Sequence, residues 1–199
     1  MKRLFDIVCS TLGLLVLLPA FVIVVTLIKI ESPGPGLYTQ QRVARGGKMF
    51  NLFKFRTMHA NADKLTAITV GARDPRITRI GYYLRKYKID ELPQLINVVR
   101  GDMSLVGPRP ELKKFVDLYT PEQREVLTVR PGITDFASLE FRNENELLEG
   151  KEDPIKYYVD EILPAKLALS LRYVRTRSFL LDIKIILRTI KAVFVNRQS

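Results

Sequence analysis

The sequence contains one cysteine, one histidine and no tryptophan among its 199 residues. The single cysteine, Cys9, cannot form a disulfide within the chain, so the sequence does not indicate an oxidising compartment. Because His59 is the only histidine, zinc sites built from clustered His and Cys are excluded, as are relays of two histidines. Any metal that acts here must be a hard ion bound by oxygen.

Positive charge is in excess. Lys and Arg total 32 against 21 Asp and Glu, which gives a formal net charge of +11. This excess predicts an anionic partner, and composition alone does not choose among nucleic acid, a membrane surface and a phosphorylated substrate. The length suits one domain with a hydrophobic core, and two full domains are not expected.

A long apolar run opens the chain. Residues 4 to 28 contain a single charge, Asp6. A helix of this length can cross a bilayer whose hydrocarbon core is about 30 Å thick. A signal peptide is the least favoured interpretation, because the run is long and no small-x-small cleavage pattern follows it.

Pro19 interrupts the apolar run and predicts a bend. A proline inside a helix removes one hydrogen bond and clashes with the carbonyl four residues earlier, here that of Leu15. Basic residues flank both ends of the run: Lys2 and Arg3 precede it, and Lys29, Arg42, Arg45 and Lys48 follow it. The positive-inside tendency would keep both ends cytoplasmic. A hairpin that re-enters one leaflet satisfies both flanks, and a kinked span remains the alternative.

A proline- and glycine-rich break, ESPGPGLY at residues 31 to 38, ends the apolar helix. It divides the chain into a membrane helix, residues 1 to 30, and a catalytic or binding domain, residues 31 to 199. Within that domain, residues 49 to 58 predict a short strand with Lys54 and Arg56 on one face. The common outcome of such a pattern is a solvated basic face.

Two short helices are expected next, over residues 77 to 88 and from Asp90 to the glycine at position 101. Asp90 is a suitable N-cap, Glu91 suits the first turn, and Gly101 is placed to end the helix. Taken alone, an Asp at the N-cap followed by a Glu in the first turn is common at the start of a helix and indicates no catalytic role. Arg109 follows between two prolines, in a turn that is predicted to be stiff.

A final helix is predicted after Ser178, its cap. It has an apolar stripe that includes Phe179, Ile183, Leu187 and Ile190, and a basic stripe beside it. Such a helix either lies on an anionic membrane or packs on the domain core with its basic face solvated. The apolar N-terminus favours the membrane interpretation.

Several motifs together resemble the bacterial sugar transferase family of monotopic phosphoglycosyl transferases. They run along nearly the whole chain in order: KRLFD (2 to 6), SPGP (32 to 35), QQRV (40 to 43), KFRTM (54 to 58), DELPQLINVVRGDMSLVGPRPE (90 to 111) and RPGIT (130 to 134). The long central motif is the most specific. One departure is Leu18, where many members carry Ser immediately before the break proline.

The resemblance implies a mostly helical α+β fold, with a re-entrant helix broken at Pro19, a short β element and amphipathic interfacial helices. It also implies transfer of a sugar 1-phosphate from a UDP-sugar to polyprenol phosphate, usually undecaprenyl phosphate, with release of UMP. Such an enzyme acts at the cytoplasmic face of the bacterial inner membrane, against inner-leaflet lipids. A nucleic-acid partner is then not expected, and neither the sugar nor the oligomeric state is predicted.

The resemblance also assigns residues. Asp90 is implied as the nucleophile of a ping-pong reaction and Glu91 as a ligand of Mg²⁺. Lys54, Arg85 and Arg109 match positions implied to bind substrate phosphates. These roles agree with the chemistry, since phosphoryl transfer depends mainly on fixed cations around the phosphate.

Two other functions remain open at this stage. A membrane-tethered protein could use its basic charge to bind nucleic acid or anionic lipid without turnover. A metal-dependent phosphodiesterase could use the same carboxylates to hold a metal for attack by water, and would release UMP without a lipid acceptor.

Overall fold

The computed structural model describes residues 1–59, 62, 69–71 and 74–195. A long helix, α1 (Lys2–Glu31), leads into an antiparallel hairpin of β1 (Leu37–Val43) and β2 (Met49–Phe55), with the short helical turn η1 (Arg45–Gly47) between the strands. Leu37 pairs with Phe55 at one end of the hairpin and Val43 with Met49 at the other. The strand predicted within residues 49 to 58 is confirmed over Met49–Phe55, as β2.

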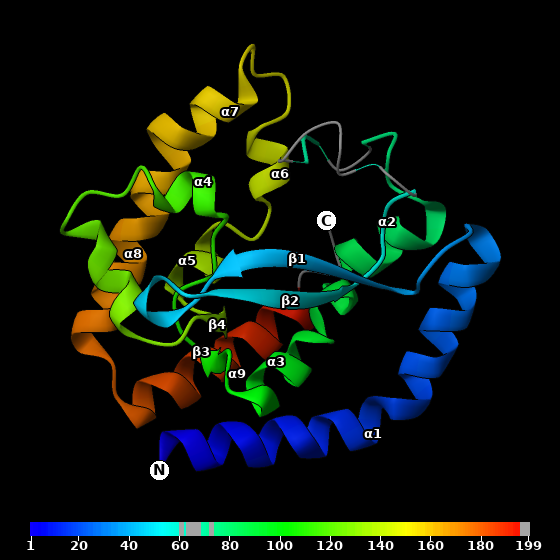
Figure 1. The fold of residues 1–199 in the computed structure, drawn as a ribbon, viewed down its shortest axis with the longest axis horizontal. Helices are drawn as coiled ribbons and strands as arrows, with labels where there is room; N and C mark the ends of the chain where they lie inside the picture. The colour runs from blue at the N-terminus through cyan, green and yellow to red at the C-terminus, as the bar shows by residue number, and fades with distance from the viewer. Residues whose placement is uncertain (60–61, 63–68, 72–73, 196–199) are drawn as a thin grey trace.

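The rest of the chain is mainly helical (Figure 1). In order, its described residues form α2 (Arg79–Lys86), η3 (Ile89–Glu91), α3 (Gln94–Arg100), β3 (Ser104–Val106), α4 (Lys113–Val116), η4 (Gln123–Thr128), β4 (Gly132–Thr134), α5 (Phe136–Glu140), α6 (Glu144–Leu147), α7 (Pro154–Tyr157), η5 (Tyr158–Ile162), α8 (Leu163–Thr176) and α9 (Phe179–Val195). The expected mostly helical α+β fold is therefore confirmed.

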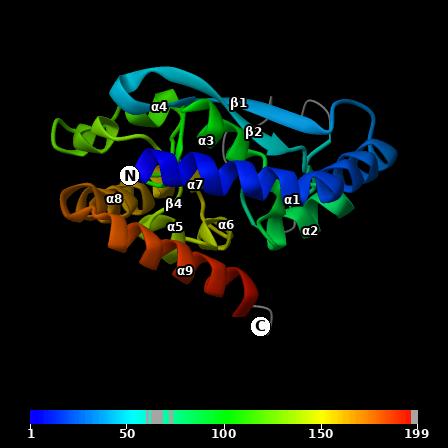
Figure 2. The same ribbon diagram turned by 90° about the horizontal axis from the view of Figure 1, so that it is seen from below.

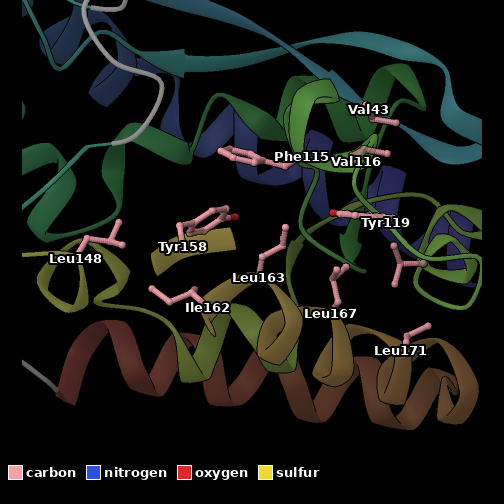
Figure 3. Close-up of a cluster of buried hydrophobic side chains, with 11 residues drawn as sticks. Val43, Phe115, Val116, Tyr119, Leu148, Tyr158, Ile162, Leu163, Leu167 and Leu171 are labelled. Carbon is pink, nitrogen blue, oxygen red and sulfur yellow. The ribbon is translucent and has the colours of Figure 1, made fainter. Parts of the chain in front are cut away.

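The largest hydrophobic core lies between β1, α4, η5 and α8. Figure 3 shows its side chains pointing into one interior from both sides, with Phe115 of α4 facing Tyr158 of η5. The two rings lie 4.9 Å apart between centroids. A second, parallel strand pair joins β3 to β4 beside this core, with Ser104 opposite Gly132 and Val106 opposite Thr134.

The helix α1 is the one helix in the described part of the chain that is long and apolar enough to cross a membrane. Pro19 lies inside it, and Figure 1 shows the helix changing direction along its length. A proline is the usual cause of such a bend. Many of its apolar side chains are exposed, including Leu15 at 64%, Val16 at 78% and Val22 at 61%.

The first turns of α1 are fixed to the domain by polar contacts. The Lys2 ammonium donates to Asp182 of α9 at 2.6 Å, and Ser104 donates to the Asp6 carboxylate at 2.8 Å. Phe5 stacks edge-on against Phe179, with 5.3 Å between ring centroids. Figure 2 shows α1 and α9 running across the same side of the molecule.

The predicted final helix is confirmed as α9, and Ser178 caps it by accepting the N–H of Leu181 at 3.2 Å. One side of the helix packs inward, where Ile185 is fully buried. Another side leaves Leu180 81% exposed and Leu187 62% exposed. The helix thus packs on the core and also presents an apolar row outward.

Candidate active site

Asp90 and Glu91 lie in the short turn η3, just before α3. The expectation that Asp90 caps a helix is wrong, because α3 begins at Gln94 and no side chain caps it. Asp90 instead lies inside the turn η3, where the Ile89 carbonyl accepts the N–H of Leu92 at 3.1 Å. The chain enters this turn through Lys88 in a left-handed backbone conformation, φ 56°, and not through Asp90 in the extended conformation of an N-cap. Gly101 ends α3 as predicted.

Asp90 is buried, with 7% of its surface exposed. Its Oδ1 atom has no hydrogen-bond partner in the described structure. A buried carboxylate oxygen without a partner is costly, and each such atom in a native protein requires an explanation. The amide of Gln94, one helical turn further on, is also buried with its nitrogen and oxygen both unpaired. Sequence reasoning did not single out Gln94.

Glu91 is held by two cations. Both oxygens of its carboxylate accept hydrogen bonds from the two terminal nitrogens of Arg109, the Nη1 bond measuring 2.9 Å. The Lys54 ammonium lies 3.7 Å from Glu91 Oε1. A fork of this kind is the strongest arrangement that arginine and a carboxylate form, and it fixes the direction of both groups.

The two adjacent acids have opposite pKa shifts. Burial raises the pKa of Asp90, and the negative charge of Glu91 raises it further, against the opposing effect of Lys54 and Arg85. Burial alone would also raise the pKa of Glu91, but Arg109 and Lys54 outweigh it and hold that pKa well below its usual range. Neighbouring carboxylates with divergent pKa values are a feature of catalytic sites.

Lys54 points from β2 toward this acid pair. The solvated basic face that is the common outcome of this pattern does not occur here, because Lys54 faces Glu91 and Arg56 is buried with 7% exposure. Burial lowers the pKa of Lys54 to about 8, although Glu91 opposes the shift. A lysine with such a pKa is partly neutral near physiological pH.

Arg85 approaches from α2, the helix that was predicted over residues 77 to 88. Its Nε donates to the hydroxyl of Thr57 at 2.8 Å, and its Nη1 donates to the hydroxyl of Thr69 at 3.1 Å. The Arg85 charge is among those that oppose the raised pKa of Asp90. Thr57 and Thr69 were not predicted as site residues, since nothing in their local sequence distinguishes them.

Arg109 is presented by the stiff turn that follows β3. Gly107 donates its N–H to the Thr134 carbonyl at 2.9 Å, and Gly132 donates to the Pro108 carbonyl at 2.9 Å. A Cβ atom at Gly132 would collide with the Gly107 backbone. The two segments therefore approach so closely that glycine is required, and this fixes the base of the turn that carries Arg109.

The structure brings five predicted residues into one cluster: Lys54, Arg85, Asp90, Glu91 and Arg109. Lys88 is a further cation near both acids. Four cations against two carboxylates leave an excess of positive charge, which suits a ligand with at least two negative charges. Pro19 belongs to α1 and takes no part in this cluster. A buried acid pair among fixed cations is the arrangement expected of an enzyme that acts on phosphate groups.

Comparison with known proteins agrees with this chemistry. The family model described as Bacterial sugar transferase matches residues 1–196, and the chain belongs to this family. A protein of Bacillus subtilis (strain 168), named for transfer of N-acetylgalactosaminyl 1-phosphate to undecaprenyl phosphate, is 44% identical over 152 residues, covering 76% of this chain and 81% of its own length.

Two further relatives cover nearly the whole chain. A UDP-glucose:undecaprenyl-phosphate glucose-1-phosphate transferase of Caulobacter vibrioides is 38% identical over 195 residues, which is 96% of this chain and 69% of that protein. The exopolysaccharide production protein ExoY of Sinorhizobium fredii is 33% identical over 213 residues, which is 100% of this chain and 87% of that protein. The names of the relatives include two different sugars.

Proposed function

We propose that this protein transfers a sugar 1-phosphate from a UDP-sugar to undecaprenyl phosphate and releases UMP, as the first membrane step in building a bacterial glycan. The observation that carries the proposal is the Asp90 carboxylate, which is buried among cations with one oxygen unpaired. Membership of the bacterial sugar transferase family and the names of its relatives support the substrates.

In the proposed mechanism, Asp90 attacks the β-phosphorus of the UDP-sugar. A bond forms between the Asp90 oxygen and phosphorus, and the bond from that phosphorus to the oxygen of UMP breaks, so UMP leaves with the electron pair. A phosphate oxygen of the polyprenol then attacks the same phosphorus, and the carboxylate is released unchanged. Splitting the transfer in this way makes the reaction ping-pong.

The cations are proposed to bind and stabilise phosphate oxygens. Arg109 presents a planar fork that matches a phosphate as well as it matches Glu91. Lys54 and Arg85 add fixed positive charge near the nucleophile, where negative charge develops in the transition state. Their attraction also favours the ionised form of Asp90 against the burial that raises its pKa.

The acid pair fits Mg²⁺, the hard cation that this family is expected to use. The described residues contain no group of three or more His, Cys, Asp or Glu side chains that would form an all-protein metal cage. Mg²⁺ typically takes only one or two protein carboxylates together with substrate phosphates, and the unpaired Oδ1 of Asp90 and the remaining lone pairs of Glu91 offer them. When bound, the ion would neutralise charge on the diphosphate.

We further propose that α1 enters one leaflet, turns at its bend and leaves on the same side, with the domain on the cytoplasmic face of the inner membrane. The exposed apolar side chains of α1 and the outward apolar row of α9 support this placement. The basic residues at both ends of α1 support re-entry over crossing.

The test of this function is UMP release by purified protein from a UDP-sugar, with and without undecaprenyl phosphate and Mg²⁺. Sustained release should require both, and Asp90→Asn should abolish it. Near wild-type turnover by Asp90→Asn would exclude Asp90 as nucleophile. Steady release without the lipid would favour a phosphodiesterase, and binding without any turnover would favour a tethered binding protein.

A further inference from the structure

The last residue of α1 also caps the helix that carries Arg85. Glu31 accepts the backbone N–H of Arg79 at 2.7 Å on one carboxylate oxygen, and that of Ile80 at 2.9 Å on the other. Thr78 completes the cap by accepting the N–H of Gly81 at 2.9 Å. A negative charge at a helix N-terminus is favourable, and these bonds also fix where the helix begins.

Arg85 lies in the last turn of the same helix, α2, at the end that faces Asp90. The position of α2 along β2 is tightly constrained, because the N–H of Thr78 donates to the Thr57 carbonyl at 3.0 Å. A Cβ atom at Gly81 would collide with that same carbonyl. In a helix of eight residues, a shift at the capped end moves the other end as well.

The end of α1 is fixed to the same point of the hairpin. The buried guanidinium of Arg56 donates to the carbonyls of Ser32 at 2.6 Å and Pro33 at 2.7 Å. Thr57, the next residue, receives the Arg85 hydrogen bond. The apolar side chains beneath this junction form one buried cluster, in which Phe21 of α1 stacks edge-on against Phe55 with 4.9 Å between ring centroids.

We propose that Glu31 is a positioning residue, which sets Arg85 against Asp90 by holding the first turn of α2 to the end of α1. This inference rests on the proposed function of Asp90. It gives the apolar helix a second role beyond attachment, since the placement of that helix then determines how a catalytic cation meets the nucleophile. Glu31 itself touches neither acid of the site and acts only through α2.

The structure predicts which kinetic quantity changes when this contact is lost. The charged groups that face Asp90 are Glu91, Lys54, Arg85 and Lys88. If Arg85 retreats, the maximum kcat falls, because Arg85 no longer stabilises the transferring phosphoryl group.

The experiment compares Glu31→Ala and Glu31→Gln in the full chain, reconstituted in bilayers with undecaprenyl phosphate. Glu31→Ala should lower kcat by at least about tenfold, with a smaller change in the KM for the UDP-sugar, as expected for lost orientation. Glu31→Gln keeps one acceptor oxygen and should give an intermediate loss. Because Glu31→Gln is the milder change, the same criteria apply to it if Glu31→Ala does not fold.

A double-mutant cycle separates positioning from general damage. If Glu31 acts through Arg85, adding Glu31→Ala to Arg85→Ala should cause little further loss. The matched control is Asp153→Ala, which removes a carboxylate cap from α7, where Asp153 accepts the N–H of Ile155 at 3.1 Å and of Lys156 at 2.9 Å. This control should lower stability and leave both kcat and the KM for the UDP-sugar unchanged.

An unchanged kcat in both Glu31 variants would overturn the inference, as would losses that add fully to that of Arg85→Ala. Failure of the underlying function gives a different result. If Asp90→Asn retains near wild-type turnover, Asp90 is not the nucleophile and the premise of the inference fails. If Asp90→Asn is inactive while the Glu31 variants behave as wild type, only the positioning role is wrong.

Discussion

The ammonium nitrogen of Lys54 lies 3.7 Å from a carboxylate oxygen of Glu91, and burial lowers the pKa of this lysine to about 8. The charged form is therefore lost as pH rises through about 8 in the free protein. If the charge binds a substrate phosphate, kcat/KM should fall about tenfold per pH unit above that value. Lys54→Arg should move the fall to higher pH, because arginine remains protonated. An identical basic limb in Lys54→Arg would exclude Lys54 as its origin.

Glu91→Gln should move the high-pH fall of kcat/KM in the opposite direction, to lower pH. Glu91 is the largest influence that keeps the pKa of Lys54 from falling further. Without its charge that pKa drops, so the decline of kcat/KM should begin at lower pH. Removing one partner of a buried ion pair typically costs about 3–5 kcal/mol, so thermal unfolding of this variant should also occur at lower temperature. A basic limb that stays in place would show that Lys54 and Glu91 are not coupled.

Arg109 should not be replaceable by lysine. Lysine keeps the charge but cannot donate two parallel hydrogen bonds from one plane. A lost hydrogen bond to a charged group is worth about 1.5–3 kcal/mol, which corresponds to about a 10- to 100-fold lower kcat/KM. Lys113→Arg is a suitable control, since Lys113 is an exposed cation paired with Asp117 at 2.7 Å. Wild-type kinetics in Arg109→Lys would contradict the role of the fork.

The topology of α1 can be measured with single cysteines. Cys9 is first replaced, and one cysteine is then introduced before Lys2 or after Ile30. In intact cells, a membrane-impermeant thiol reagent should reach neither position, and both should react once the inner membrane is permeabilised. Labelling of only one position in intact cells would show a crossing helix and rule out re-entry.

Local patterns in the sequence predicted much of the secondary structure. The alternation in β2, the amphipathic spacing in α2, the serine before α9 and Gly101 after α3 all act within a few residues of the element that they define. The pair of Asp90 and Glu91 was predicted as the reacting centre, but its place in the backbone was predicted wrongly. Asp90 lies inside the turn η3, and α3 begins only at Gln94.

Long-range contacts account for what the sequence could not predict. Strand alternation shows that Lys54 and Arg56 share a face. It does not show that Lys54 lies against Glu91, or that Arg56 lies against the end of α1. The pairing of β3 with β4 involves three residues in each strand, too few for a recognisable pattern. Nothing local marks Glu31 as the cap of a helix that begins 48 residues later.

The donor sugar can be identified with a panel of UDP-sugars. The relatives are named for N-acetylgalactosamine and for glucose. We therefore expect the UDP derivative of one of these two sugars to give faster UMP release than any other donor in the panel. The comparison should be made at low donor concentration, where the rate reports kcat/KM and hence discrimination in the transition state. Equal rates with all donors would contradict a sugar-specific site.

The central claim is that the Asp90 carboxylate becomes covalently bonded to phosphorus during the reaction, and intact-mass spectrometry tests it most directly. Protein mixed with its UDP-sugar and Mg²⁺, without lipid, should gain the mass of one sugar phosphate, and peptide mapping should locate it at Asp90. Addition of undecaprenyl phosphate should remove the adduct. Protein that stays unmodified, under conditions where lipid-dependent product accumulates, would contradict the account.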